Sequence, residues 1–164
     1  MIGKMEFQEI YNKVQNNIQI RMDEAEELYK CAKRLPENAV VVEIGTLYGG
    51  SANILAAAIS GMVYTIDNDP KFETKILDNI LLIKGNSKDV AVGWDKPIDL
   101  LFIDGDHSYE GAMEDIENWI PKVKNGGMVI FHDYGSWNGV TKAVNEAIER
   151  KIIGFPSSLL LTIK

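Results

Sequence analysis

The chain has 164 residues, of which 46% are hydrophobic and 25% are charged, enough to bury the core of one globular domain without disulfides. Acidic residues outnumber basic ones by 24 to 17 and give a formal net charge of −7, which disfavours a nucleic-acid partner held through its phosphates. A single cysteine, Cys31, rules out an internal disulfide, and no apolar stretch approaches the ~18 to 20 residues of a membrane span, so we expect a cytoplasmic protein with no membrane partner.

Two helical patterns come first. Apolar residues recur at helical spacing from Phe7 to Val14 and again from Ala25 to Leu35. Asp23 with Glu26 resembles a capping box at the start of the second pattern, and the following proline ends it.

Short apolar runs rich in β-branched residues then alternate with helical patterns. The predicted strands are 39–45, 62–67, 80–84, 98–104 and 127–132, and the clearest predicted helices between them are 52–60, 109–120 and 140–148. This alternation predicts an α/β fold, a three-layer α/β/α sandwich around a mostly parallel, Rossmann-like sheet. Residues 151–155 and 159–163 leave no room for a helix between them, so we expect an antiparallel C-terminal hairpin at one edge. The expected organisation is a single domain over 1–164, with N-terminal helices in 1–37 and the core in 38–164.

A glycine-rich turn follows the first predicted strand, in the run Glu43-Ile-Gly-Thr-Leu-Tyr-Gly-Gly-Ser51. Glycines let the backbone approach a ligand, and the start of the next helix attracts an anionic group. The spacing is not that of dinucleotide binders, and Ser51 stands where a P-loop requires lysine. Asp67 ends the next strand, where a carboxylate can accept hydrogen bonds from both hydroxyls of a ribose. A ribose-bearing ligand with an amino-acid end fits S-adenosylmethionine better than NAD or ATP.

Structural explanations compete with this interpretation. The glycines can simply allow close packing between helix and strand, with Asp67 capping a turn. Asn86 and Ser87 follow the third strand, where they can border an adenine or form an ordinary surface turn.

The two histidines of the chain, His107 and His132, fall after strands that we expect to be neighbours. Asp104, Asp106 and Asp133 accompany them. Carboxylates gathered in this way repel one another unless a cation, a proton or a basic group intervenes, and a divalent metal is the simplest explanation. The competing explanation is that these residues cap a helix and support a turn.

Four motifs in this order resemble those of class I S-adenosylmethionine-dependent methyltransferases: 41–51, 65–67, 99–109 and 124–134. The resemblance runs from about residue 40 to the C-terminus and implies a seven-stranded sheet with one antiparallel strand. It assigns Glu43, Gly45 and Gly49 to the methionine end of the cofactor, Asp67 to the ribose, and Asn86 with Ser87 to the adenine; Thr46, Tyr48, Ser51, Asn68 and Asp104 complete the expected cofactor contacts.

Within that family the chain is most similar to metal-dependent O-methyltransferases of the catechol and macrolide-sugar type. This similarity implies metal ligation by Asp104, His132 and Asp133, although His132 departs from the usual acidic or amide residue. The similarity implies magnesium, but an imidazole suits manganese, zinc or iron better. Magnesium and manganese therefore both remain open. His107 matches the general base of the macrolide-sugar enzymes, so His107 and Asp104 are the expected catalytic residues for a small hydroxylated acceptor.

Aromatic residues near these loops form either substrate walls or packing between helices and sheet; they are Tyr48, Tyr109, Tyr134 and Trp137. We expect Phe102 and Trp119 in the core. Two other functions stay open: a non-haem iron enzyme on the same fold, and a non-catalytic module that binds S-adenosylmethionine or another nucleoside. A homo-oligomer also stays open.

Overall fold

The fold is that of a computed structural model, which describes residues 5–72, 77–150 and, for the backbone alone, 158–163. In chain order the helices and strands are α1 (Phe7–Val14), α2 (Met22–Lys33), β1 (Val40–Ile44), α3 (Gly50–Ala58), β2 (Met62–Asp67), β3 (Ile80–Lys84), α4 (Ser87–Val92), β4 (Ile98–Ile103), α5 (Tyr109–Trp119), the 3-10 helix η1 (Ile120–Lys122), β5 (Val123–Tyr134), α6 (Asn138–Glu149) and β6 (Ser158–Ile163). Among these described residues, no helix is long and apolar enough to cross a bilayer.

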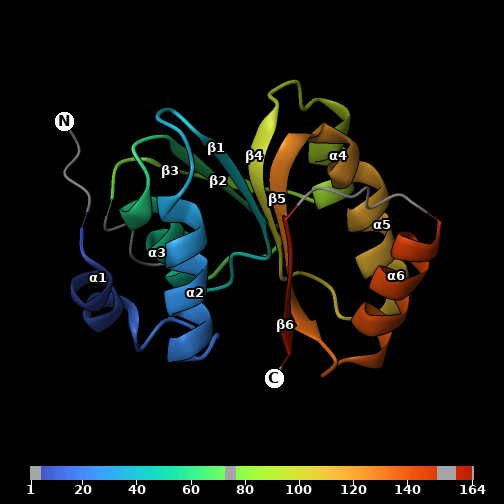
Figure 1. Cartoon of the computed structure of the whole chain (residues 1–164), viewed down its shortest axis with the longest axis horizontal. Helices are drawn as coiled ribbons and strands as arrows, with labels where there is room; N and C mark the ends of the chain where they lie inside the picture. Colours follow the sequence, from blue (N-terminus) through green and yellow to red (C-terminus); the bar gives the residue numbers. More distant parts are fainter. Residues whose placement is uncertain (1–4, 73–76, 151–157, 164) are drawn as a thin grey trace.

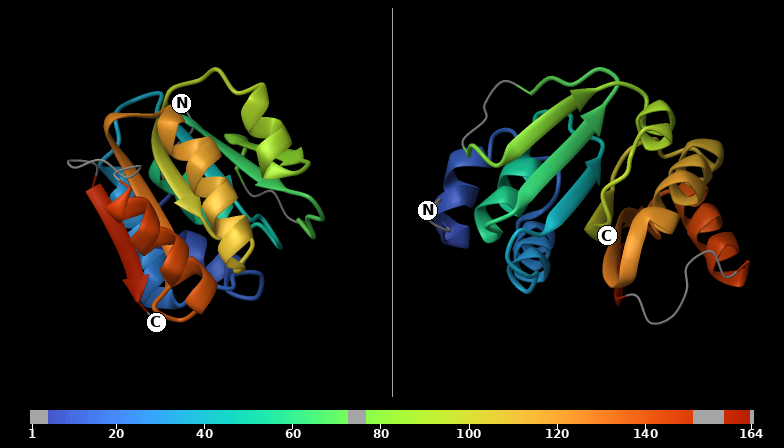
Figure 2. Two further views of the ribbon diagram at one scale, coloured as in Figure 1. Left: turned by 90° about the vertical axis from the view of Figure 1, so that its right-hand side faces the viewer. Right: turned by 90° about the horizontal axis from the view of Figure 1, so that it is seen from above.

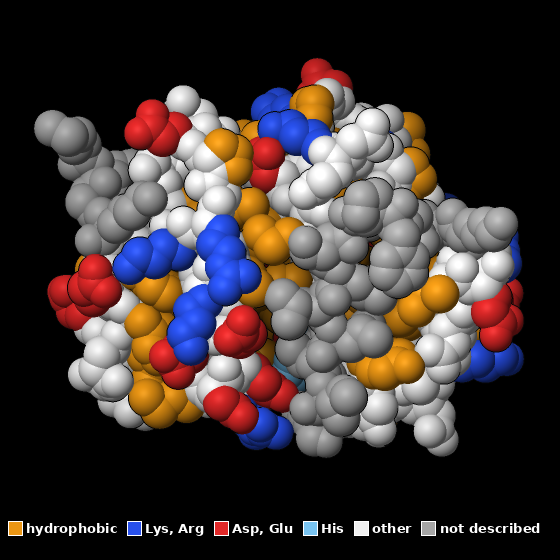
Figure 3. Space-filling view, in the orientation of Figure 1, with side chains coloured by type: hydrophobic (Ala, Val, Ile, Leu, Met, Phe, Trp, Pro, Cys, Tyr) orange, Lys and Arg blue, Asp and Glu red, His pale blue; other side chains and the backbone are white. Residues whose placement is uncertain are grey.

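The strands form one sheet in the order β3-β2-β1-β4-β5-β6, and every neighbouring pair is parallel. Helices α1 to α3 cover one face of the sheet and α4 to α6 cover the other (Figures 1 and 2). On the outer side of the first layer, charged side chains gather over α2, where Lys30 pairs with Glu26 at 3.0 Å (Figure 3). The predicted α/β/α sandwich with a parallel, Rossmann-like sheet is therefore confirmed.

Both faces of the central strands are buried, which explains their continuous apolar sequences. Successive residues alternate between the two cores: Val41 packs with α1 to α3, and Val42 packs with α4 to α6. Phe102 and Trp119 are at most 1% exposed, as expected for core residues. Helix α3 is buried at every position because its side chains are small or apolar.

The described residues do not support the antiparallel C-terminal hairpin or the count of seven strands. The described sheet has six strands, and β6 runs parallel to β5, with Met128 opposite Ser158. Helix α6 lies between these two strands in the chain and supplies the crossover that a parallel pair requires. The first arm of the expected hairpin, 151–155, lies outside the described residues.

Two local details also differ from the prediction. The backbone N–H of Arg21 donates to the Glu24 carboxylate at 2.8 Å, so the cap of α2 lies two residues before the predicted box of Asp23 and Glu26. Helix α4 was missed because its six residues are too few to show a helical period. The single-domain organisation and the homo-oligomer stay predictions.

The strand order reverses between β1 and β4, whose carboxyl ends lie side by side. Gly45, directly after β1, has φ +93°, and a Cβ there would lie 1.9 Å from the backbone oxygen of Asp104. Only glycine fits this close approach. Ligands bind at such a reversal in open α/β sheets, and the loops after β1, β2, β3, β4 and β5 all open toward it.

Candidate active site

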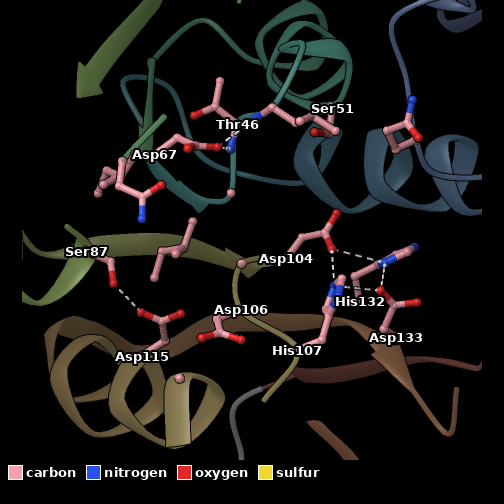
Figure 4. Close-up of a pocket in the computed structure, with 18 of the residues that line it drawn as sticks. Thr46, Ser51, Asp67, Ser87, Asp104, Asp106, His107, Asp115, His132 and Asp133 are labelled. Carbon is pink, nitrogen blue, oxygen red and sulfur yellow. Dashed lines mark hydrogen bonds and ion pairs between the residues drawn. The ribbon is translucent and has the colours of Figure 1, made fainter. Parts of the chain in front are cut away.

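A cavity of about 660 Å³ lies along the carboxyl ends of the strands (Figure 4). Its lining residues come from the strand ends and the loops after them, from α5 and from the segment before α2: Asn17, Gln19, Ile20, Ile44, Gly45, Thr46, Leu47, Tyr48, Ser51, Ile66, Asp67, Asn68, Gly85, Asn86, Ser87, Asp104, Gly105, Asp106, His107, Gly111, Glu114, Asp115, His132, Asp133 and Trp137. One end holds the predicted nucleoside-binding residues, and the other holds the histidines and carboxylates. The volume is in the range of small-molecule sites.

Asp67 organises the glycine-rich loop. Its Oδ2 accepts hydrogen bonds from the backbone N–H groups of Thr46 and Leu47, both at 2.9 Å, and its Oδ1 accepts from the N–H of Asp69 at 2.8 Å. These bonds hold Leu47 at φ +43°, an uncommon conformation for a branched side chain. Asp67 therefore caps a turn, as the structural alternative supposed, while it also lines the cavity.

Glu43 and Gly49 do not line the cavity. Glu43 is fully buried beneath the loop, where it accepts a hydrogen bond from the Thr65 hydroxyl. Burial raises its pKa to about 8, although the hydroxyls of Ser51 and Thr65 oppose this shift. Gly49 starts α3 at φ +80°, and a Cβ there would lie 2.1 Å from the ring of Phe72. Both residues support the loop from the side that faces away from the cavity.

At the end of the cavity where adenine binding was predicted, the polar side chains are already bonded to the protein. The Asn86 side chain accepts from the backbone N–H of Lys88 at 2.9 Å and caps α4. Ser87 donates to Asp115, a 5% exposed carboxylate on α5 that the sequence prediction missed. Burial raises the pKa of Asp115 to about 6. No local motif marked Asp115, because it sits inside an ordinary helical pattern.

At the other end, two imidazoles converge on two carboxylates (Figure 4). His107 Nε2 lies 3.0 Å from Asp133 Oδ2 and 3.8 Å from Asp104 Oδ1. His132 Nδ1 lies 3.0 Å from the same Asp133 oxygen and 3.2 Å from Asp104 Oδ1. Asp106 stands apart, since its carboxylate accepts from the N–H of Ser108.

A distortion of β5 brings His132 and Asp133 together. Consecutive strand residues normally point to opposite faces of a sheet. Asp133 instead adopts φ +61°, and the pairing of β5 with β6 shifts register between Phe131 and Tyr134. This turn places the Asp133 carboxylate on the same side as the His132 ring, as irregular strand ends often do beside active sites.

The carboxylates change the pKa of both histidines. The carboxylate of Asp104 raises the pKa of His107, against the effect of burial. Burial lowers the pKa of His132, but Asp104, Asp133 and Glu24 outweigh it and raise the value to about 9. For Asp104, burial opposes ionisation, yet the two imidazoles bring its pKa below the usual range.

The donor set fits a divalent cation. Ligand atoms of Asp104, His107 and Asp133 all lie within 4.8 Å of one another, and His132 Nδ1 approaches both carboxylates from the other side. Oxygen and imidazole donors together suit manganese, zinc or iron. Of the predicted residues, the structure thus brings together the expected ligands Asp104, His132 and Asp133, and it places His107 Nε2 beside them.

Two of the four candidate wall aromatics line the cavity. Trp137 is half exposed and stacks on His107, with ring centroids 4.7 Å apart and planes at 20°. Tyr48 lines the cavity from the loop between β1 and α3. Tyr109 and Tyr134 instead donate their hydroxyls to Glu146 and Asn145 of α6. These two are packing residues.

The segment between α1 and α2 forms a wall of the cavity that was not among the predicted site residues. Asn17, Gln19 and Ile20 line the cavity. A Cβ on Gly50 would lie 2.6 Å from the backbone oxygen of Asn17, so this segment packs directly on the start of α3. The glycine pair at 49–50 was a signal for this contact as well as for a ligand.

Comparisons with known proteins agree with this geometry. The profile of a family described as "Methyltransferase domain" matches residues 42–134. An uncharacterized protein of Acanthamoeba polyphaga mimivirus is 30% identical over 134 residues, which cover 68% of this chain and 60% of the viral protein. The chain thus spans less than two thirds of that relative, and it spans 4% of an uncharacterized protein of Sinorhizobium fredii.

Solved structures share the fold. An O-methyltransferase from Bacillus cereus in complex with SAH (S-adenosylhomocysteine) is 19% identical, with a TM-score of 0.66, over 88% of this chain and 77% of that one. MycE methyltransferase from the mycinamycin biosynthetic pathway, in complex with Mg and SAH, is 17% identical, with a TM-score of 0.63, over 91% of this chain and 50% of that one.

Proposed function

The chain belongs to this methyltransferase-domain family, and from that membership we propose that it methylates a hydroxyl oxygen of a small acceptor, using S-adenosylmethionine. We further propose that a divalent cation assists and that His107 is the general base. The observation that carries the proposal is the single cavity that joins the glycine-rich loop to the histidines and carboxylates. A methyl donor bound at the glycine-rich loop and an acceptor bound at the histidines would lie next to each other in this cavity.

The charge of the cavity supports this pair of ligands. Among the residues that the structure describes, its lining includes six acidic side chains and no lysine or arginine: Asp67, Asp104, Asp106, Glu114, Asp115 and Asp133. An electronegative cleft concentrates cations and repels anions. A sulfonium cofactor and a metal ion fit such a site, whereas an acceptor that carries phosphate does not.

The glycine-rich loop and its neighbours would hold the cofactor. We assign its methionine end to the loop backbone from Gly45 to Ser51, its ribose to Asp67 and Asn68, and its adenine to the edge formed by Asn86 and Ser87. Asp67 Oδ1 accepts one hydrogen bond, so it keeps acceptor capacity for a ribose hydroxyl. Glu43 supports the loop from below rather than touching the methionine end.

The two histidines suit different roles. His132 is 4% exposed and lies deep in the cluster, which fits a ligand that joins Asp104 and Asp133 around the cation. The His107 side chain is 36% exposed and stacks on Trp137 at the cavity, where an acceptor would enter. Of the two histidines, His107 is therefore the better placed to take the hydroxyl proton.

The proposed reaction divides its tasks between the bound groups and the chain. When bound, the cofactor supplies a methyl group on a positively charged sulfur, and the cation lowers the pKa of a hydroxyl that it contacts. The chain positions the reactants and excludes water around them. His107 must be unprotonated to act, and the carboxylates that now raise its pKa are the ones that a cation would neutralise.

The family favours methyl transfer over both earlier alternatives, the iron enzyme and the non-catalytic module. Calorimetric titration with S-adenosylhomocysteine is the first test, and we expect binding in the micromolar range or tighter. The second test supplies labelled S-adenosylmethionine, Mn²⁺ or Mg²⁺, and a panel of hydroxylated acceptors. An absence of cofactor binding would overturn the proposal, and binding without turnover of any acceptor would restore the non-catalytic module.

A further inference from the structure

Helix α2 contributes a buried carboxylate to the far side of His132. Glu24 Oε2 lies 3.3 Å from His132 Nε2, and the two residues are 7% and 4% exposed. The other ring nitrogen, Nδ1, faces Asp104 and Asp133. The ring therefore lies between Glu24 and the proposed cation site, with one nitrogen directed to each.

Helix capping alone does not explain the burial of Glu24. Its Oε2 also accepts from the backbone N–H of Arg21 at 2.8 Å, and the Arg21 guanidinium lies 3.9 Å from Oε1. A capping glutamate works equally well on a solvated helix surface. A carboxylate taken out of water is costly unless a charged or hydrogen-bonded partner compensates it, and His132 is the partner that faces it from the sheet.

Histidines that bind metals through one nitrogen usually donate the other N–H to a carboxylate. That donation fixes the tautomer and the direction of the ring, and it makes the free nitrogen a stronger donor. The contacts of His107 with carboxylates, in contrast, run through Nε2, the nitrogen that already faces the cluster. Only His132 has the two-sided arrangement among the residues that the structure describes.

We propose that Glu24 is a positioning residue that holds His132 Nε2–H and so presents Nδ1 as an imidazole ligand for the cation. This inference rests on the cation site of the proposed function. Because an imidazole donor favours manganese over magnesium, Glu24 then determines which metal the site prefers. A residue in the N-terminal helices thereby sets a property of a site built by β4 and β5.

The test compares Glu24→Gln with wild-type protein. Glutamine keeps the size of the side chain and can still accept from Arg21, but it loses the charge that strengthens the imidazole. We expect Mn²⁺ affinity, measured by electron paramagnetic resonance, to fall at least about 10-fold, while Mg²⁺ affinity, measured by calorimetry, changes less than about threefold. Glu26→Gln, on the exposed side of the same helix, should change neither affinity.

A measurement on the wild-type chain avoids dependence on the variant. Nitrogen NMR of the Zn²⁺-loaded protein, with zinc as a diamagnetic probe, should show His132 protonated on Nε2 and metal-bound through Nδ1. Metal on Nε2, or no metal on His132, overturns the inference.

The outcomes separate this inference from the function on which it rests. If Asp104→Asn abolishes Mn²⁺ binding but Glu24→Gln leaves it unchanged, Glu24 is a helix cap and the cation site survives. If wild-type protein binds no Mn²⁺, both the cation site and the role of Glu24 are overturned. Failure to bind S-adenosylhomocysteine, with Mn²⁺ binding intact and sensitive to Glu24, would overturn only methyl transfer.

Discussion

The two ends of the cavity use their polar side chains in opposite ways. At the end proposed for the nucleoside, Asp67 accepts from backbone N–H groups of the glycine-rich loop, Asn86 accepts from the N–H of Lys88, and Ser87 donates to Asp115. At the proposed catalytic end, the side chains face one another. Nε2 of His107 and Nδ1 of His132 both lie 3.0 Å from Asp133 Oδ2.

This difference indicates how each end recognises its ligand. At the first end the side chains are already bonded to the protein, so this end presents a fixed backbone and a shaped wall, with acceptor capacity left on Asp67 Oδ1. The second end concentrates charge that only a proton or a cation can balance. Substitutions should therefore affect shape and cofactor affinity at the first end, and metal affinity and turnover at the second.

The largest effect is expected for Asp104→Asn. Loss of one carboxylate leaves the cation with a weaker donor set, so we expect Mn²⁺ binding to be lost and turnover to fall by about 10³-fold or more. Asp106→Asn is the matched control, because Asp106 is a neighbouring carboxylate that lines the same cavity but caps a turn and stands apart from the cluster. Equal losses in the two variants would contradict a specific cation site at Asp104.

His107→Ala should reduce kcat by about 10²-fold while leaving cofactor affinity nearly intact. The ring lies beyond the glycine-rich loop and contacts Trp137 and the carboxylates instead. Steady-state kinetics together with calorimetric titration of S-adenosylhomocysteine separate the two quantities. Unchanged turnover would remove His107 as the base.

Asp67→Ala tests the nucleoside end, where it should weaken cofactor binding by about 2 to 3 kcal/mol, since a ribose contact and the clamp on Thr46 and Leu47 are lost together. Asp69→Asn is the control, because that side chain is 70% exposed and pairs with the exposed Lys71. A lower melting temperature with an unaltered Kd would show that Asp67 serves the turn alone.

Glu43→Gln should change stability rather than binding. The pKa of Glu43 is about 8 in the folded protein against 4.5 for the free group, so the folded state holds a proton that the unfolded state releases between these values. The contribution of Glu43 to stability is therefore full below pH 4.5 and is lost as the pH rises to 8. We expect the free energy of unfolding to fall by roughly 3 to 4 kcal/mol from pH 5 to pH 8, and the variant to flatten this slope in urea titrations. An identical slope in both proteins would mean that Glu43 is ionised beneath the loop.

The sequence predicted the elements whose signal is local. Strands β1 and β4 are short, buried, β-branched runs, and α5 and α6 have clear helical periods, so all four were expected near their observed bounds. The direction of β6 was not predictable in this way, because it depends on which strand it pairs with and on the crossover through α6.

The grouping of the site residues could be predicted from the sequence about as far as the fold could. Asp104, His107, His132 and Asp133 were expected together because they follow neighbouring strands, and the structure places them together. Their precise roles need geometry: the left-handed turn at Asp133 decides which way its carboxylate points. Nothing in the local pattern around Glu24 marks it as a neighbour of His132.

The contact between Glu24 and His132 joins residues 108 positions apart. A chain made from its N-terminus exposes Glu24 to the solvent, and to chaperones, well before β5 has been synthesised. The last donors of the cation site can be arranged only after the central strands have paired. Acquisition of Mn²⁺ by a nascent or refolding chain would thus mark the end of folding, and its timing could be followed without any acceptor.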